Sequence, residues 1–355
     1  MRYLITGGAG FIGSNFLNMF VKKYPNHLFI NIDHLSYAGN LQNLKELEGY
    51  KNLVFEKVDI RDYDSLDLLF EKYRPDTIVH FAAESHVDRS IQAPKTFLET
   101  NILGTFNLLE LCKKYWKNSD KNLFHHVSTD EVYGSLGVNG FFSEDTPYNP
   151  SSPYSASKAA SDHLVKAYHN TYGIPIKITN CSNNYGPYQF PEKLIPLTIT
   201  NILSNKPIPV YGDGANIRDW LYVQDHCEAI WNVMEKGRIG ETYNIGGNNE
   251  KSNLEVVTAL CHIVAELLDE NPENYLKLIT LITDRPGHDF RYAIDSTKIQ
   301  TELAWKPKET FESGLKKTTL WYLEHKQWLE NILSGEYQNW IEKNYEGLTK
   351  GAIVK

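Results

Sequence analysis

A short apolar strand that runs directly into a glycine-rich turn most constrains what this chain can fold into. Residues Arg2–Thr6 are typical of a β-strand, and Phe11–Lys23 of a helix. The segment between them completes a Gly-x-Gly-x-x-Gly pattern at Gly8, Gly10 and Gly13. Glycines in this position allow a tight turn and a close backbone approach to a pyrophosphate, whose charge is favoured by the free N–H groups and the dipole at a helix N-terminus. The sequence therefore predicts a dinucleotide site at the start of the chain.

Strands and helices go on alternating through the first half of the chain. Further strands are expected at Leu28–Ile32, Leu53–Val58, Thr77–Ala82, Leu123–Ser128 and Ile176–Thr179. Further helices are expected at Asp64–Tyr73, Phe97–Trp116 and Ser155–Tyr172. This alternation is typical of an α/β fold with a Rossmann-type, doubly wound parallel sheet that helices cover on both faces.

The second half of the chain is richer in proline, glycine and asparagine, and its strands are less regular. We expect residues 1–182 to form an NAD-binding Rossmann domain, and residues 183–355 to form mainly a second, smaller α/β domain that binds the substrate. Residues Tyr222–Gly247 again resemble a helix followed by a strand, Thr242–Ile245. Whether this segment returns to the first domain is left open, so the boundary is not a clean cut.

A carboxylate ends the second expected strand. Asp33 follows Gly13 by twenty residues, a position from which it can accept hydrogen bonds from both hydroxyls of the adenosine ribose. No arginine follows Asp33 immediately, and its charge would repel a 2′-phosphate, so NAD is favoured over NADP. Asp59, after the third strand, is a weaker candidate for contact with the adenine edge.

A Tyr-x-x-x-Lys pattern lies at the start of the expected helix Ser155–Tyr172. Tyr154 and Lys158 are four residues apart, so they share one face of a helix. A tyrosine titrates near ~10 and needs stabilisation of its phenolate, from Lys158 and from a positive nicotinamide ring, to act as a base at neutral pH. Lys158 is also placed to hold the nicotinamide ribose.

Two adjacent acids follow the strand that begins at Leu123. The segment reads Ser-Thr-Asp-Glu, and the end of a parallel strand lies at the cofactor edge of the sheet. Thr129 offers a hydroxyl to polarise a sugar hydroxyl. Asp130 and Glu131 can divide the acid and base roles that the elimination of water requires, whereas a simple dehydrogenase or epimerase has no need of the pair.

Composition excludes several other classes of protein. The formal net charge of −8 argues against a nucleic-acid partner, because such binders are more often basic. The cysteines Cys112, Cys181, Cys227 and Cys261 form no C-x-x-C pair, and H-E-x-x-H is missing from the sequence, so we expect no metal site and no disulfide framework. No apolar run approaches the length of a membrane span or of a signal-peptide core, and we expect a cytoplasmic protein.

These motifs together resemble the nucleotide-sugar 4,6-dehydratases of the extended short-chain dehydrogenase/reductase family, and their dTDP-glucose branch in particular. The resemblance runs almost end to end. It is carried by TGGAGFIG from Thr6, AAESHVDRS from Ala82, STDEVYG from Ser128, PYSASK from Pro153, NCSNNYGPYQFPEKLIP from Asn180, IRDWLYVQDH from Ile217, ETYNIGG from Glu241, DRPGHDFRYAID from Asp284 and WKPKETFESG from Trp305.

The resemblance implies a lyase that keeps NAD tightly bound and converts dTDP-glucose into dTDP-4-dehydro-6-deoxyglucose and water, in deoxysugar biosynthesis with dTDP-rhamnose as the expected route. Tyr154, with Thr129, takes the 4-hydroxyl proton while hydride leaves C4. Glu131 then takes the C5 proton, Asp130 protonates the departing C6 hydroxyl, and hydride returns to C6.

The resemblance also implies which residues line the site. Those for the cofactor are Gly7, Gly10, Phe11, Ile12, Gly13, Asp33, Asp59, Ile60, Ala82, Ala83, Ser85, Thr100, Tyr154, Lys158 and Asn184. Those for the nucleotide sugar are Ser85, Thr129, Asn183, Glu192, Lys193, Leu194, Pro209, Tyr211, Arg218, Asn253, Arg285 and His288. Arg218 and Arg285 are the cations expected for the diphosphate, whereas Arg89 is a candidate for an internal ion pair.

Helices Phe97–Trp116 and Ser155–Tyr172 carry apolar stripes. The resemblance implies a homodimer in which these two helices pair with their copies as a four-helix bundle. The alternative is that the stripes pack on the sheet of their own chain. Trp321, Trp328 and Trp340 are expected to be packing residues.

Three other functions stay open. They are a UDP- or CDP-hexose 4,6-dehydratase, a UDP-sugar 4-epimerase, and a non-enzymatic NAD-sensing protein.

Overall fold

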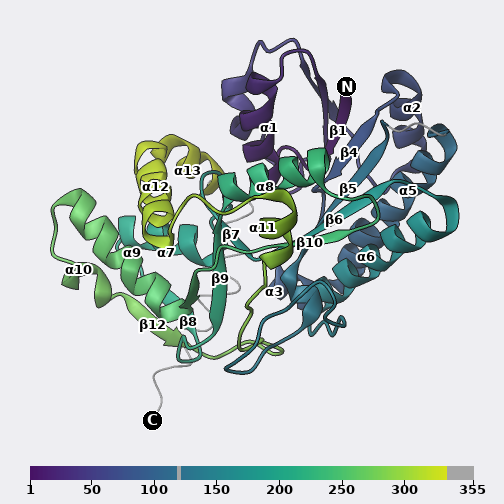
Figure 1. The fold of residues 1–355 in the computed structure, drawn as a ribbon. Coiled ribbons are helices and arrows are strands. Elements are labelled where there is room, and N and C mark those ends of the chain that lie inside the picture. The colour runs from purple at the N-terminus through teal and green to yellow at the C-terminus, as the bar shows by residue number, and fades with distance from the viewer. Residues whose placement is uncertain (118–120, 334–355) are drawn as a thin grey trace.

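The computed structural model describes residues 1–117 and 121–333, and in that part of the chain seven parallel strands form one sheet (Figure 1). The strand order is β10-β6-β5-β4-β1-β2-β3, which reverses direction next to β1. Ligands bind at such a switch point, beyond the carboxyl ends of the strands. The prediction of a doubly wound parallel sheet is confirmed.

The strands of this sheet lie close to their expected positions. They are β1 (Arg2–Thr6), β2 (Leu28–Asp33), β3 (Leu53–Lys57), β4 (Thr77–His80), β5 (Leu123–Thr129), β6 (Ile176–Cys181) and β10 (Thr242–Ile245). The helices around it are α1 (Phe11–Lys23), α2 (Tyr63–Tyr73), α3 (Val87–Gln92), α4 (Pro94–Phe97), α5 (Gly104–Tyr115), α6 (Pro153–Tyr172), α8 (Val223–Lys236) and α11 (Thr297–Leu303).

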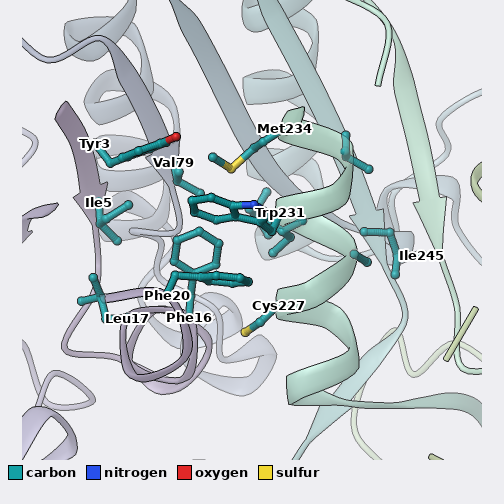
Figure 2. Packing of buried hydrophobic residues seen from close by; sticks show 14 of the residues in the cluster. Tyr3, Ile5, Phe16, Leu17, Phe20, Val79, Cys227, Trp231, Met234 and Ile245 are labelled. Carbon is teal, nitrogen blue, oxygen red and sulfur yellow. The ribbon is translucent and has the colours of Figure 1, made fainter. Parts of the chain in front are cut away.

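Alternate residues of each strand point to opposite faces of the sheet, and both faces are buried. Tyr3 and Ile5 of β1 pack with α1 and α8, whose Phe16, Phe20 and Trp231 form an aromatic cluster (Figure 2). Leu4 of β1 faces the other side, where α2, α5 and α6 cover the sheet. This two-sided burial explains why the strands read as continuous apolar runs.

The segment after β6 builds most of a smaller second lobe. Its strands are β7 (Asn183–Tyr185), β8 (Ile208–Tyr211), β9 (Ile217–Tyr222), β11 (Glu250–Ser252) and β12 (Ile279–Ile282). Its helices are α7 (Leu194–Leu203), α9 (Asn253–Leu268), α10 (Glu273–Leu276), α12 (Phe311–Glu324) and α13 (Lys326–Leu333). The segment containing α8 and β10 belongs to the first sheet, because β10 pairs in parallel with β6. Trp321 and Trp328 pack into the second lobe's core, and Trp340 lies outside the described residues.

The expected continuous helix Phe97–Trp116 is wrong in one respect. Between α4 and α5 the chain forms a π-helical segment, Leu98–Leu103. The carbonyl of Asn101 within it accepts hydrogen bonds from the hydroxyls of Thr105 and Ser161, and its side chain bonds to Glu84 and Ser157. These tertiary contacts favour the wider turn, a feature that often lies beside functional sites.

Among the described helices, none is long and apolar enough to cross a membrane. The same part of the chain contains no cluster of histidine, cysteine and acidic side chains suited to hold a metal ion. All four cysteines are buried and unpaired.

Candidate active site

Two adjoining cavities open at the carboxyl edge of the large sheet. The first, of about 460 Å³, is lined by every residue that the sequence analysis assigned to the cofactor and to catalysis. The second, of about 170 Å³, is lined by all of the expected sugar-nucleotide residues except Ser85 and Thr129, which line the first. Glu131, Asn183, Glu192 and Lys193 line both, so they stand where the two cavities meet.

The glycine-rich turn forms a cradle at one end of the first cavity. Gly7 has a φ of +71°, and a Cβ placed there would lie 2.7 Å from the Ala82 nitrogen. A Cβ at Gly13 would lie 2.4 Å from the Gly7 carbonyl oxygen. Helix α1 begins after Gly10 with no side-chain cap and no acidic residue in its first turn. An uncapped, positively polarised helix end in a tight glycine cradle fits the pyrophosphate of NAD.

Two carboxylates, Asp33 and Asp59, also line this cavity. Asp33 accepts hydrogen bonds from the backbone N–H groups of Ala9 (3.0 Å) and Leu35 (2.8 Å), which hold it in place. Burial raises its pKa, and these N–H groups oppose the shift. Asp59 is held by the Arg61 guanidinium, at 2.6 Å between Nη2 and Oδ2. Asp59 thus lies beside the cavity as expected, with Arg61, which the sequence analysis did not single out, as its partner.

The two adjacent acids project into the site from a short 3₁₀ turn after β5. Thr129 caps this turn, since its Oγ1 accepts a hydrogen bond from the Glu131 N–H at 3.3 Å. Asp130 is only 1% exposed, and burial, Glu131 and Asp219 together raise its pKa well above the usual range. Burial also raises the pKa of Glu131, but Lys193, Arg285 and Arg218 oppose that shift. The surroundings therefore favour a protonated Asp130 beside a more readily ionised Glu131.

Tyr154 and Lys158 are buried on α6, as expected, but their contacts differ from the expected pairing. The Lys158 ammonium donates a hydrogen bond to the Val127 carbonyl at 2.9 Å. Burial and the charge of Glu131 raise the pKa of Tyr154 well above its usual value, while the polar side chain of Thr129 opposes that rise. Lys158 is not among the groups that shift the Tyr154 pKa in the protein without NAD, so the predicted lowering of that pKa by Lys158 is not found there.

A buried polar group behind Lys158 was missed by the sequence analysis. His126 Nε2 lies 3.5 Å from Lys158 Nζ and 3.1 Å from Asp162 Oδ1. Asp162 also accepts hydrogen bonds from the hydroxyls of Ser128 and Tyr148 at 2.9 Å each. Two signals were available: a polar histidine within an apolar strand, and an aspartate four residues after Lys158 on the same helix face.

The second cavity holds the cations expected for a diphosphate. Arg218 donates hydrogen bonds to the Ile217 and Asp289 carbonyls and stacks on Tyr292, 4.2 Å from the ring centre. The Arg285 guanidinium forms an ion pair with Asp88 at 3.0 Å. Both arginines line the second cavity, so the structure brings them together as predicted. Each guanidinium also contacts groups of the chain itself: backbone carbonyls for Arg218 and the Asp88 carboxylate for Arg285.

Three side chains tie the loop after β2 to the second lobe. Tyr37 donates a hydrogen bond to Glu192 at 2.8 Å, and Arg89 lies 3.4 Å from the same carboxylate and 3.6 Å from the Tyr37 ring. Arg89 is therefore the ion-pair partner that its sequence position indicated. The loop that carries Tyr37 lines the first cavity through Ser36, Ala38 and Gly39. No sequence pattern pointed to Tyr37, because its partner is 155 residues away.

The substitution Tyr37→Phe is expected to loosen this loop. The ring that stacks on Arg89 is kept, but the Glu192 carboxylate, which is 5% exposed, loses a donor. Leaving a buried acceptor short of a donor lowers the free energy of unfolding by about 1–3 kcal/mol. Urea denaturation measures this loss, and the NAD that remains after gel filtration should also fall. Tyr50→Phe, at an exposed tyrosine, is the control, and an equal effect of both substitutions would contradict the assignment.

Comparison with known proteins is consistent with this geometry. The family model described as GDP-mannose 4,6 dehydratase matches residues 4–318. The dTDP-glucose 4,6-dehydratase of Salmonella typhimurium is 55% identical, over 98% of this chain and 99% of the relative. The dTDP-glucose 4,6-dehydratase of Bacillus anthracis, solved in complex with NAD, is 48% identical with a TM-score of 0.83, covering 94% of this chain and 99% of that one. That of Streptomyces venezuelae, solved with NAD and a dTDP ligand, is 45% identical with a TM-score of 0.86, covering 94% and 100%.

Proposed function

The chain belongs to the GDP-mannose 4,6-dehydratase family, within which its high-identity relatives are dTDP-glucose 4,6-dehydratases, and from this membership we propose the reaction that it catalyses. The enzyme converts dTDP-α-D-glucose into dTDP-4-dehydro-6-deoxy-α-D-glucose and water. It is an NAD-dependent hydro-lyase of deoxysugar biosynthesis. The observation that carries this function is the pair of acids, Asp130 and Glu131, held in one cavity with Tyr154.

The residues divide the chemistry as their surroundings favour. Tyr154, assisted by Thr129, accepts the proton of the sugar 4-hydroxyl. The chemistry that NAD supplies when bound is the acceptance of a hydride from C4 and its return to C6. The 4-ketone acidifies the C5 hydrogen, which Glu131 removes, and Asp130 protonates the departing C6 hydroxyl. Asp130 must carry a proton to protonate the C6 hydroxyl, and its pKa is raised. The elimination step therefore proceeds at pH values below the Asp130 pKa and is lost as the pH rises through it.

The first cavity would hold NAD and the second the nucleotide. Gly7, Gly13 and the start of α1 would hold the pyrophosphate, and Asp33 the adenosine ribose. Arg218 and Arg285 would bind the diphosphate of the sugar nucleotide, with Tyr211 and Pro209 beside the base. Residues 1–182, joined by the segment with α8 and β10, would form the NAD-binding domain, and the rest of the chain after residue 182 mainly the substrate domain.

We also propose a homodimer in which α5 and α6 pair with their copies as a four-helix bundle. Support comes from large apolar side chains that stay exposed along these helices and the preceding π-helical segment: Leu98, Leu103, Phe106 and Tyr172.

The four buried, unpaired cysteines support a cytoplasmic location. Within deoxysugar biosynthesis, we propose the dTDP-rhamnose route.

Parallel assays with dTDP-, UDP- and CDP-glucose test the function. The purified enzyme with NAD is expected to form the 4-keto product, measured by its absorbance in alkali, at least about tenfold faster from dTDP-glucose, the discrimination that one or two base contacts supply. A preference for UDP- or CDP-glucose would assign the enzyme to a different hexose dehydratase. Conversion of UDP-glucose to its C4 epimer without loss of water would mean a UDP-sugar 4-epimerase instead.

A further inference from the structure

An acidic side chain, Asp88, lines the second cavity, where the anionic diphosphate would bind. It lies in the first turn of α3, and an acid in that position commonly stabilises the positive end of a helix. The cap of α3 is, however, provided by His86, whose Nδ1 accepts a hydrogen bond from the Arg89 N–H at 3.4 Å. The Asp88 carboxylate extends across to the second lobe instead, so its contacts there need a separate explanation.

Each oxygen of the Asp88 carboxylate contacts a different residue of the second lobe. Oδ1 accepts a hydrogen bond from Nη1 of Arg285, which follows β12, and the two groups form an ion pair at 3.0 Å. Oδ2 accepts a hydrogen bond from the Tyr211 hydroxyl, at the end of β8, at 3.2 Å. The Arg285 guanidinium also lies 5.9 Å from the centre of the Tyr211 ring. One carboxylate of the first lobe therefore holds two neighbouring side chains of the second.

The bond to Asp88 leaves one edge of the Arg285 guanidinium for a ligand. A guanidinium is planar, and its Nε and Nη2 donors form a fork that matches two oxygens of a phosphate. Asp88 takes Nη1, which lies outside that fork. The Arg285 Nε group is buried and has no hydrogen-bond partner within residues 1–117 and 121–333. Because a buried donor without an acceptor is unfavourable, this edge of Arg285 favours an incoming anion.

We propose that Asp88 is a positioning residue for the nucleotide sugar, an inference that rests on the function proposed above. Its carboxylate fixes the Arg285 guanidinium so that the Nε–Nη2 fork is left for the diphosphate, and it holds the Tyr211 ring beside the base. Arginine has many rotamers, and holding its side chain in place before the ligand arrives reduces the entropy lost on binding. Asp88 acts through these two side chains and does not touch the reacting atoms.

Calorimetric titration of the NAD-containing enzyme with dTDP tests this role in Asp88→Ala. Loss of a hydrogen bond to a charged group is expected to weaken dTDP binding by about 10–10²-fold. The KM for dTDP-glucose should rise by a similar factor while kcat stays within about threefold, because the same contacts are made in the ground state and the transition state. Asp88→Asn, which keeps an acceptor for Arg285, should recover part of the lost affinity.

The matched control is Asp64→Ala, which removes an exposed acid from the first turn of α2, outside both cavities. It should bind dTDP as tightly as the unmodified enzyme. A double variant then separates an effect through Arg285 from a general loss of structure. In an Arg285→Met background, Asp88→Ala should weaken dTDP binding by clearly less than it does alone, because the guanidinium that it positions is already missing.

Equal or tighter binding of dTDP by Asp88→Ala would overturn the inference, since it would mean that the carboxylate only repels the diphosphate. Fully additive losses in the double variant, or a fall in kcat without a rise in KM, would overturn it as well. Should Asp88→Ala fail to fold, the titration of Asp88→Asn decides, with weaker binding expected and equal or tighter binding contradicting the role. Loss of the proposed function is recognised separately, because the unmodified enzyme would then form no 4-keto product from dTDP-glucose.

Discussion

Glu131→Gln is expected to retain oxidation at C4 and to lose exchange of the C5 hydrogen with solvent. A glutamine amide keeps the size of the side chain but cannot accept the C5 proton, so elimination should slow by about 10²–10⁴-fold, the usual contribution of a general base. The three cations that face Glu131, Lys193, Arg285 and Arg218, would remain in place. In deuterated solvent, mass spectrometry of the recovered sugar nucleotide should show no deuterium at C5. The absorbance of NADH should accumulate because the hydride has nowhere to return.

Asp130→Asn is the matched control, since it changes the neighbouring acid in the same way. It should keep deuterium exchange at C5, because Glu131 is intact, and it should lose water at C6 far more slowly. Opposite signatures in the two variants would assign the base to Glu131 and the acid to Asp130. Undiminished C5 exchange in Glu131→Gln would remove Glu131 from the base role.

Gly13→Ala is expected to abolish stable binding of NAD. Its Cβ would lie 2.4 Å from the Gly7 carbonyl oxygen and 2.8 Å from the Gly8 Cα, and both of these atoms belong to backbone that cannot rotate away. Gly13 is the third glycine of the pattern, the one that allows close packing of the helix on the strand. The turn would have to move by several tenths of an ångström, and the start of α1, which would hold the pyrophosphate, would move with it. Overpacking of this kind costs about 1–3 kcal/mol of folding stability in addition to the lost site. We expect Gly13→Ala to retain less than about one tenth of the NAD that the unmodified enzyme binds per chain. A loss of ~1.4 kcal/mol of binding free energy corresponds to a tenfold loss of affinity.

The bound cofactor is measured by the absorbance of NAD released on acid denaturation, and stability by urea unfolding. Gly137→Ala is the control, because a Cβ at that position meets no atom within 4 Å. Retention of NAD by Gly13→Ala at the level of the Gly137→Ala control would show that the cradle tolerates a side chain. The placement of the pyrophosphate there would then be wrong.

The parts of the site that the sequence predicted correctly are those that depend on short-range order. The strand β1, the turn from Gly7 to Gly13 and helix α1 are contiguous, so their geometry follows from local pattern and from glycine's lack of a Cβ. The acid pair could be placed for a similar reason. It follows β5 directly, and all parallel strands present their carboxyl ends to one edge of the sheet.

Other features were decided by contacts between distant segments. The π-helical turn at Leu98–Leu103 depends on Ser157 and Ser161 of α6, which a helical periodicity cannot reveal. Tyr37 and Glu192 meet across 155 residues of chain. The contacts of Lys158 with Val127 and His126 depend on how α6 packs against β5, which is why its expected pairing with Tyr154 was not found.

By itself, the sequence determined the α/β class, the dinucleotide turn and the identity of the side chains that carry the chemistry. Only the tertiary structure decided which oxygen of Asp130 faces Thr129, which cations face Glu131, and how deeply each acid is buried. The physical reason is that strand and helix periodicity is set within a few residues. Protonation, by contrast, depends on charges and burial within a few ångströms in space, and those neighbours come from strands, helices and loops of both lobes.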